Sequence, residues 1–135
     1  MNVTLDKTTN PWTVDVDQHG NGNHFGRNAS TQTITWQLTG DAASGFFVPM
    51  SDPSLNPGFS WVSEPPQGIF GYPPTISSNG NQMTMTDLNS GTLPNGTSTV
   101  GTWTYKLRVN VGGTVYTSLA ISIRATNNNP TIVNN

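Results

Sequence analysis

The sequence contains no cysteine, and only 9% of its 135 residues are charged. The missing cysteine excludes disulfide bonds, a thiol nucleophile and a zinc site built from thiolates. About a quarter of an average globular chain is charged, so this protein must cover its surface with uncharged polar side chains. The formal net charge is −2, and the five basic residues are scattered without forming a basic stripe. Because nucleic-acid binding depends on many phosphate contacts, we expect no nucleic-acid partner.

Residues that favour long helices are also scarce. Asn, Thr, Ser, Gly and Pro together supply more than half of the chain, and only 33% of the residues are hydrophobic. This composition is typical of strands and turns. No apolar run is long enough to span a membrane, and the chain does not begin with a basic and apolar signal segment. We therefore expect no membrane span and no signal peptide in this chain, while the composition favours an extracellular or surface location.

The clearest local pattern is a strict alternation of apolar and polar residues over 101–111. Such a period of two predicts a strand with one buried face and one solvated face. Two glycines follow at 112–113, and a second β-rich run continues to 124, so the whole stretch predicts a β-hairpin. The apolar positions of the first strand are Trp103, Tyr105, Leu107, Val109 and Val111.

Two turns could join the strands of this hairpin. A two-residue turn at Gly112 and Gly113 would pair Val111 with Thr114, whereas a three-residue loop would pair Val111 with Val115. The longer loop places apolar residues of the two strands opposite each other, and cross-strand partners share a face. Burial therefore favours the three-residue loop. The same register points Tyr116 outward, despite its hydrophobic character.

Further short strands are expected along the rest of the chain, separated by turn signals and without an amphipathic helix. We expect one domain over residues 1–135, folded as an all-β, antiparallel β-sandwich with immunoglobulin-like or related Greek-key topology and about seven or eight strands. A Gly/Asn-rich loop is expected over 18–27. The expected strands are 2–6, 12–16 with Trp12, Val14 and Val16 buried, 31–38, 45–50, 83–86 and a short C-terminal run at 131–133.

The segment 51–74 is unusual because it combines six prolines with four aromatic residues. Proline cannot donate to a sheet ladder, so the segment is expected to form edge strand, bulge or loop. The rings of Phe59, Trp61, Phe70 and Tyr72 are the best candidates for ligand binding, because exposed rings stack on sugars or dock a partner. The alternative is that they fold inward and cap the core.

Candidates for metal binding and catalysis are sparse. Asp15, Asp17 and His19 lead into a Gly/Asn-rich loop, where oxygen ligands could hold calcium. The alternative is a solvated strand face, and apart from calcium we expect no cofactor. Asp52 and Glu64 could act as paired carboxylates in glycoside hydrolysis if they flanked one cleft. No Ser/His/Asp arrangement or phosphate-binding loop is present, so no catalytic residue is assigned and we expect the protein not to be an enzyme.

The segment 51–74 also carries a resemblance. The dipeptides Asp52-Pro53 and Glu64-Pro65, the run 61–66, the strand 101–109 and the C-terminal 130–134 resemble the DP-EP family of small bacterial proteins of unknown function. The resemblance covers roughly the last two thirds of the chain. It implies a compact β-sandwich, and it brings no activity or catalytic residue.

These observations favour a non-enzymatic structural or interaction module whose partner is a protein or a second copy of the chain. Exposed sheet edges pair readily, and charges that block such pairing are scarce here. If the C-terminal run is such an edge, a proline at Ile132 should abolish association. The alternative is a carbohydrate-binding module that takes polysaccharide on the exposed aromatic rings and is assisted by calcium.

Overall fold

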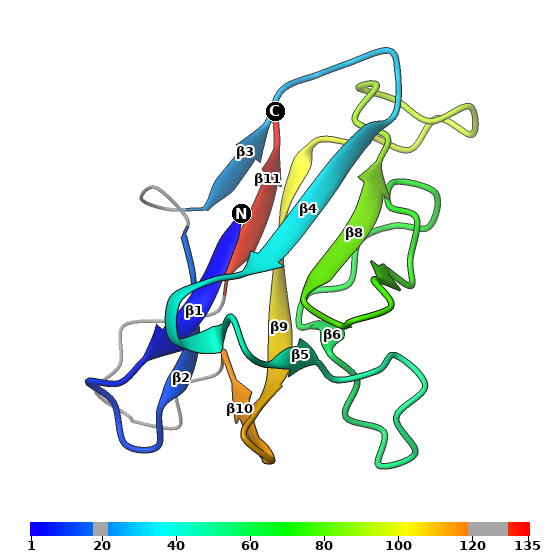
Figure 1. The fold of residues 1–135 in the computed structure, drawn as a ribbon. Helices are drawn as coiled ribbons and strands as arrows, with labels where there is room; N and C mark the ends of the chain where they lie inside the picture. Colours follow the sequence, from blue (N-terminus) through cyan, green and yellow to red (C-terminus); the bar gives the residue numbers. More distant parts are fainter. Residues whose placement is uncertain (18–21, 119–129) are drawn as a thin grey trace.

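Two β-sheets pack face to face in the computed structural model, which describes residues 1–17, 22–118 and 130–135 (Figure 1). The all-β sandwich expected from the sequence is confirmed. The described residues contain eleven strands instead of seven or eight, because several strands are only two to four residues long. The sheets are mixed and not purely antiparallel as expected, since β1 runs parallel to β4 and β11 runs parallel to β3. No helix in these ranges is long and apolar enough to cross a membrane.

The first sheet has the order β2-β1-β4-β8-β7. Its centre is formed by β4 and β8, which pair over six residues with Trp36 opposite Met83. The buried face of β4 consists of Ile34, Trp36 and Leu38, as the alternation predicts. The strand bounds are β1 Asn2–Asp6, β2 Thr13–Val16, β4 Gln32–Leu38, β7 Thr75–Ile76 and β8 Gln82–Asp87, and a short 3-10 turn, η1 Gly40–Ala42, follows β4.

The second sheet is built around β9, the long strand predicted from the alternation. Four shorter strands pair with β9, namely β5 and β6 along one edge and β10 and β11 along the other. The strand β3 lies beyond β11, where the sequence predicts only loop. The bounds are β3 Asn23–Phe25, β5 Phe46–Phe47, β6 Phe59–Trp61, β9 Gly101–Val111, β10 Thr114–Thr117 and β11 Thr131–Asn134.

The predicted hairpin register is wrong, because β9 and β10 are joined by the two-residue turn. Thr114 pairs with Val111, and Gly112 and Gly113 have φ of 62° and 87°. Positive φ at both central residues is the geometry of a type I′ turn, whose twist matches that of the strands. Tyr116 therefore pairs with Val109 on the inner face and is half-buried. The part of the predicted second strand beyond 118 lies outside the described residues.

The predicted register assumed that the buried residues of β9 need apolar partners on the neighbouring strand. This assumption fails because the facing sheet covers β9. Leu107 and Val109 are fully buried although their partners are not aliphatic. Ser118 is buried opposite Leu107, and its hydroxyl accepts a hydrogen bond of 2.9 Å from the Leu107 amide. The prediction of a buried Trp12 is also wrong. Its ring is 39% exposed and stacks on Tyr116 at 5.7 Å, beside the buried Val14 and Val16 of β2.

Three aromatic rings occupy the centre of the core. Trp36 on β4 donates a hydrogen bond of 2.9 Å from Nε1 to the hydroxyl of Tyr105 on β9. The ring of Phe59 on β6 stacks on Tyr105 at 5.1 Å and meets Trp36 edge to face at 5.6 Å. All three side chains are fully buried. These contacts link the two sheets and hold β6, in the middle of the Pro/aromatic segment, against the core.

The C-terminal strand is not the exposed edge that the sequence analysis expected. β11 lies between β9 and β3, and Ile132 is fully buried opposite Trp103. Asn89 holds the adjacent chain end, because its Nδ2 donates to the carbonyls of Phe25 and Asn135 at 3.0 and 3.2 Å. A proline at Ile132 would therefore disrupt the sheet itself, and it cannot serve as a test of edge pairing.

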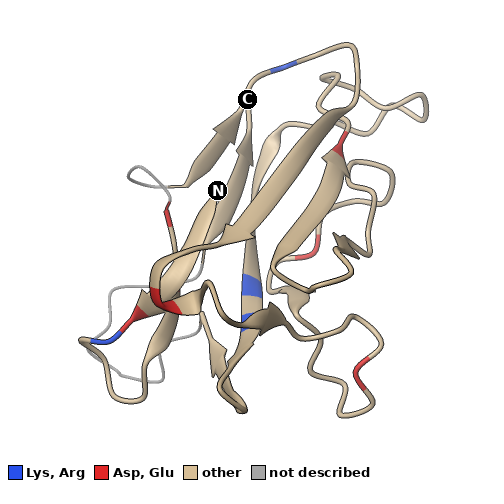
Figure 2. Ribbon diagram, in the orientation of Figure 1, with Lys and Arg blue, Asp and Glu red and all other residues tan. Residues whose placement is uncertain are grey.

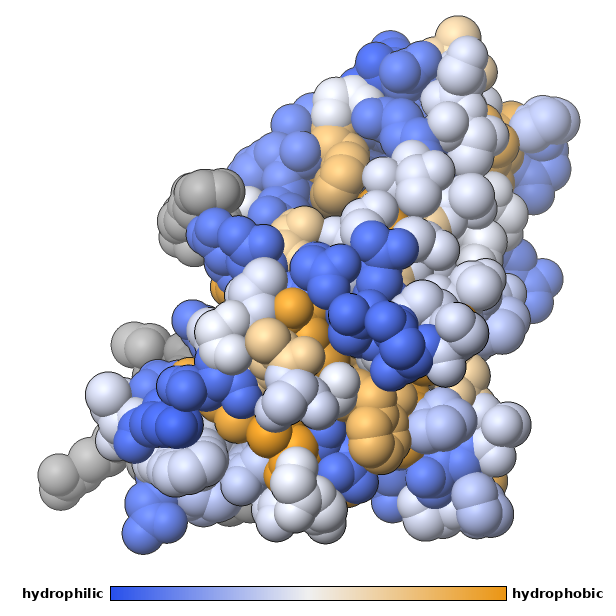
Figure 3. Space-filling model, viewed as in Figure 1, coloured by the Kyte–Doolittle hydropathy of each residue, from blue (hydrophilic) through white to orange (hydrophobic). Residues whose placement is uncertain are grey.

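The surface reflects the low content of charge. Figure 3 shows a face covered mainly by hydrophilic residues, with the most hydrophobic atoms in its lower half and smaller, paler apolar groups above them. Charged positions are few on the ribbon; one group of acidic and basic positions lies at the lower left, where Lys7 pairs with Asp41, and two basic positions lie together on β9 (Figure 2). These are Lys106 and Arg108, which share the outer face of that strand.

Candidate ligand-binding site

A pocket of about 290 Å³ opens where the Pro/aromatic segment leaves β6. The segment passes from Trp61 through a proline-rich loop and then runs beside β8, where the Ile69 carbonyl accepts a hydrogen bond from the Leu88 amide. The Gly71 amide in turn donates to the Thr86 carbonyl. We call this cavity the Pro/aromatic pocket; it is lined by Trp61, Glu64, Pro65, Pro66, Gln67, Gly68, Phe70 and Tyr72.

The aromatic rings of the pocket are supported from below by buried rings. Trp61 meets Phe59 edge to face at 4.9 Å and contacts Phe70 at 5.1 Å. Phe70 also packs edge to face on Trp103 at 5.3 Å. Because each ring is held by others, the pocket wall is preorganised, and little side-chain entropy remains to be lost when a ligand binds.

The four rings singled out in the sequence take two different roles. Phe59 is fully buried and presents no surface to a ligand, so for this residue the inward-folded alternative holds. Trp61 and Phe70 are half-buried, and Tyr72 is 49% exposed at the rim. The structure therefore brings three of the four rings together around one cavity and places the fourth beneath them.

The polar groups of the pocket are few. Glu64 and Gln67 are both exposed, and among the residues that the structure describes no lysine or arginine forms an ion pair with Glu64. Asp52, the other acid of the segment, lines a different pocket. The two carboxylates considered for glycoside hydrolysis therefore do not flank the same cavity. The Pro/aromatic pocket is equipped for stacking and hydrogen bonding.

The metal candidates lie at the β2 edge of the first sheet, whereas the Pro/aromatic segment runs beside β8 near the other edge. Asp15 is on β2 and Asp17 follows that strand, whereas His19 lies outside the described residues. Burial raises the pKa of Asp15, and repulsion by Asp6 and Asp17 adds to this effect. Within 1–17, 22–118 and 130–135, no three acidic, His or Cys side chains form a group that could hold a metal ion. Calcium at this place stays a prediction.

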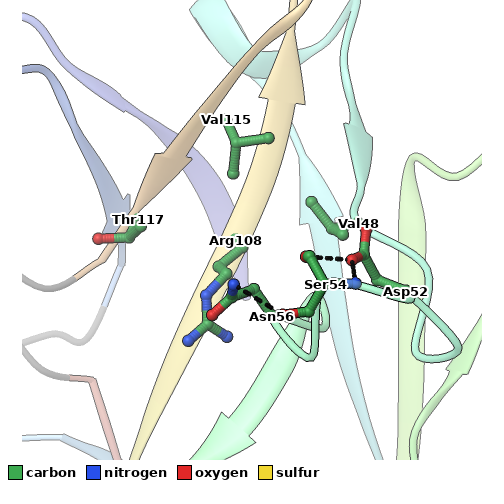
Figure 4. A pocket seen from close by; sticks show the side chains of 7 residues that line it. All are labelled: Val48, Asp52, Ser54, Asn56, Arg108, Val115 and Thr117. Atoms are coloured by element: carbon green, nitrogen blue, oxygen red, sulfur yellow. Dashed lines mark hydrogen bonds between the residues drawn. The ribbon is translucent and has the colours of Figure 1, made fainter.

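A second pocket, of about 350 Å³, was not anticipated from the sequence. It lies on the outer face of the second sheet between β10 and the loop that joins β5 to β6 (Figure 4). We call it the Arg108 pocket; it is lined by Val48, Asp52, Ser54, Asn56, Arg108, Val115 and Thr117. The sequence signal that could have identified it is the pair of cations, Lys106 and Arg108, two residues apart on the solvated face of a strand in a chain with few charges.

No protein-family model matches this sequence, and the comparison with curated proteins finds no match. The resemblance to the DP-EP family stays a prediction. The first of its dipeptides has a local structural role, because Oδ1 of Asp52 accepts a hydrogen bond of 2.7 Å from the Ser54 amide. Such an Asx turn is a common reason for an aspartate in a loop.

Proposed function

We propose that this protein is a non-enzymatic binding module, with the Pro/aromatic pocket as its ligand site and a polysaccharide as its ligand. The observation that carries the proposal is the convergence of Trp61, Phe70 and Tyr72 with one carboxylate and one amide around a single cavity. Ligand pockets combine apolar walls with a few polar groups that fix orientation. This combination suits a sugar ring, whose C–H face stacks on aromatic rings while its hydroxyls form hydrogen bonds.

The size of the pocket limits what it accepts. Its volume of about 290 Å³ is at the lower end of the range for small-molecule sites. It therefore accommodates one ring-sized portion of a chain, and the rest of the polysaccharide would extend into solvent. The separation of Asp52 from Glu64 supports binding without cleavage, because hydrolysis needs two carboxyl groups on either side of the bond.

The test is affinity electrophoresis of the whole chain in gels that contain a panel of soluble polysaccharides. Tyr72→Ala is the informative variant, because this ring is 49% exposed and its centroid lies 6.1 Å from that of Phe59, whereas Trp61 packs edge to face on Phe59 at 4.9 Å. Loss of one stacking ring commonly costs about 1–3 kcal/mol, which is about fivefold or more in affinity. Trp12→Ala is the matched control, since that ring is also exposed but precedes β2, at the far edge of the first sheet.

We expect retardation of the wild type by at least one polysaccharide, weaker retardation of Tyr72→Ala, and no change for Trp12→Ala. We expect no release of reducing sugar during the same incubation. Equal retardation of both variants and the wild type would place any binding elsewhere. A wild type that migrates freely through every gel of the panel would refute the proposed function.

Self-association through a sheet edge is the second candidate, and one observation favours it. Among the described residues β3 is the last strand of the second sheet, and its three residues Asn23, His24 and Phe25 include none of the lysines, acids or prolines that block edge pairing. His24 is exposed, so His24→Lys adds charge to this edge without removing a buried group. Sedimentation velocity should show larger species that His24→Lys reduces. A wild type that stays at 14.5 kDa at every concentration would exclude this candidate.

A further inference from the structure

The Arg108 pocket contains a guanidinium group that is only partly used by the protein. Arg108 points outward from β9, and Thr117 is its direct partner on β10. Figure 4 shows Asn56 and Ser54 on one side of the Arg108 side chain and Thr117 on the other. Nη1 donates to the carbonyl of Pro57 at 2.8 Å and to Oγ of Ser60 at 3.2 Å. Both protons of Nη1 are therefore engaged.

The other edge of the guanidinium has no acceptor among the residues described. Nε–H and one Nη2–H point in the same direction and form the side-on fork that matches the two oxygens of a carboxylate. Within residues 1–17, 22–118 and 130–135, the one ion pair joins Lys7 to Asp41 at 3.3 Å. No acid in these ranges therefore forms an ion pair with the Arg108 fork. The bonds from Nη1 to Pro57 in the loop and to Ser60 on β6 hold the fork in a fixed orientation.

The charges around the pocket favour an anion with a single negative charge. Lys106 lies on the same outer face of β9, and burial together with repulsion by Arg108 lowers its pKa. Asp52 is the one acid in the lining, and its Oδ1 accepts hydrogen bonds from the amide and the hydroxyl of Ser54. These bonds lower the pKa of Asp52 and keep it ionised. A dianion would be repelled more strongly by this carboxylate than a monoanion.

The rest of the lining adds apolar contact. Val48 and Val115 line the pocket; Val48 is almost completely buried, and Val115, which is 49% exposed on the outer face of β10, offers most of the aliphatic surface. A ligand that combines one carboxylate with a short hydrocarbon portion would contact both the fork and these valines. Asn56 contributes an amide whose Nδ2 uses one proton to bond the Ser54 carbonyl at 3.2 Å.

We propose that the Arg108 pocket binds the carboxylate of a small aliphatic monocarboxylic acid, held by Nε and Nη2 of Arg108. This site is separate from the Pro/aromatic pocket and does not depend on the polysaccharide proposal. The bonds from Arg108 to the loop also have a structural role, so the test must separate binding from support of the loop.

The experiment is an NMR titration of the ¹⁵N-labelled chain with propionate, observed at the arginine Nε–H resonances. The chain has three arginines, and Arg108→Lys identifies the signal of interest. We expect a saturable shift of the Arg108 Nε–H signal with propionate. We expect no such shift with propionamide, which has the same shape without the charge, and a weaker response to inorganic phosphate. Arg27→Lys is the matched control, since Arg27 is exposed and outside the pocket.

Asp52→Asn provides a second test that leaves Arg108 unchanged. The asparagine keeps an acceptor for the Ser54 amide but removes the negative charge beside the ligand. Charge pairs near the surface interact weakly, so the affinity for propionate should rise by only about 1.5-fold to fivefold. A propionate response that does not saturate, or one that propionamide reproduces, would overturn the proposal. Weaker binding in Asp52→Asn, or stronger binding of phosphate than of propionate, would overturn it as well.

Discussion

Asp87 and Asn134 form a buried polar pair whose hydrogen bonding is incomplete. Asp87 ends β8, Asn134 ends β11, and both are almost completely buried. Nδ2 of Asn134 donates to Oδ1 of Asp87 at 2.9 Å. The remaining oxygen of each, Oδ2 of Asp87 and Oδ1 of Asn134, has no donor among the described residues. Burial raises the pKa of Asp87, and the bond from Asn134 offsets only part of this effect.

Asp87→Asn should therefore stabilise the protein at pH 7. The asparagine has the shape of the aspartate, removes a buried charge and supplies an amide donor for Oδ1 of Asn134. A buried polar group left without a partner costs about 1–3 kcal/mol, so the free energy of unfolding should increase by about that amount. At roughly 4 °C per kcal/mol for a domain of this size, the midpoint of thermal unfolding should rise measurably.

The dependence on pH gives the decisive comparison. The pKa of Asp87 in the folded state is above its ordinary value of 3.8, so the folded state binds this proton more tightly than the unfolded state. The wild type therefore loses stability as the pH rises from 3.8 through the folded pKa. The asparagine does not titrate, and its advantage should be largest at neutral pH and should shrink on acidification toward 3.8.

The assay is urea unfolding of the wild type and Asp87→Asn from pH 7 to pH 4. The difference between the two proteins isolates the titration of Asp87 from that of the other acids. Asp52→Asn is the control, because the Asp52 carboxylate accepts hydrogen bonds from Ser54 that lower its pKa, so removal of its charge should give no advantage at pH 7. If Asp87→Asn lowered the stability at pH 7, the buried carboxylate would have to be satisfied by other donors, and the reasoning would be refuted.

Two further predictions concern the core and the hairpin turn. Tyr105→Phe should lower the free energy of unfolding by about 1–3 kcal/mol, because it leaves Nε1 of the buried Trp36 without its acceptor. In the same urea assay, Tyr116→Phe at a half-buried site should change the free energy of unfolding by less than about 0.5 kcal/mol. Gly113→Ala should lower the free energy of unfolding by about 1–2 kcal/mol because of the positive φ at this position, although the new Cβ would meet no atom within 4 Å. Gly112→Asn should leave the stability nearly unchanged, because Asn-Gly suits a type I′ turn. Equal effects of the two glycine substitutions would contradict this assignment of the turn.

The candidate site was predictable only in part. The sequence identified the Pro/aromatic segment, and three of its four rings line the pocket. It did not separate Phe59 from the others, because that choice depends on the stacking of Phe59 with Tyr105, 46 positions along the chain. The Arg108 pocket needed the structure for the same reason. Its guanidinium is oriented by the Pro57 carbonyl, which only the pairing of β6 with β9 brings close.

The sequence by itself determined where the two longest strands, β4 and β9, form and which of their faces are buried. Alternation in β4 and β9 is local, because successive side chains of a strand point to opposite faces whatever the partner is. The tertiary structure decided the hairpin register, the half-burial of Tyr116 and the interior place of β11. Each of these depends on which surfaces meet across the sandwich. A buried Ser118 opposite Leu107 is acceptable only because its hydroxyl reaches the Leu107 amide and the other sheet covers the leucine.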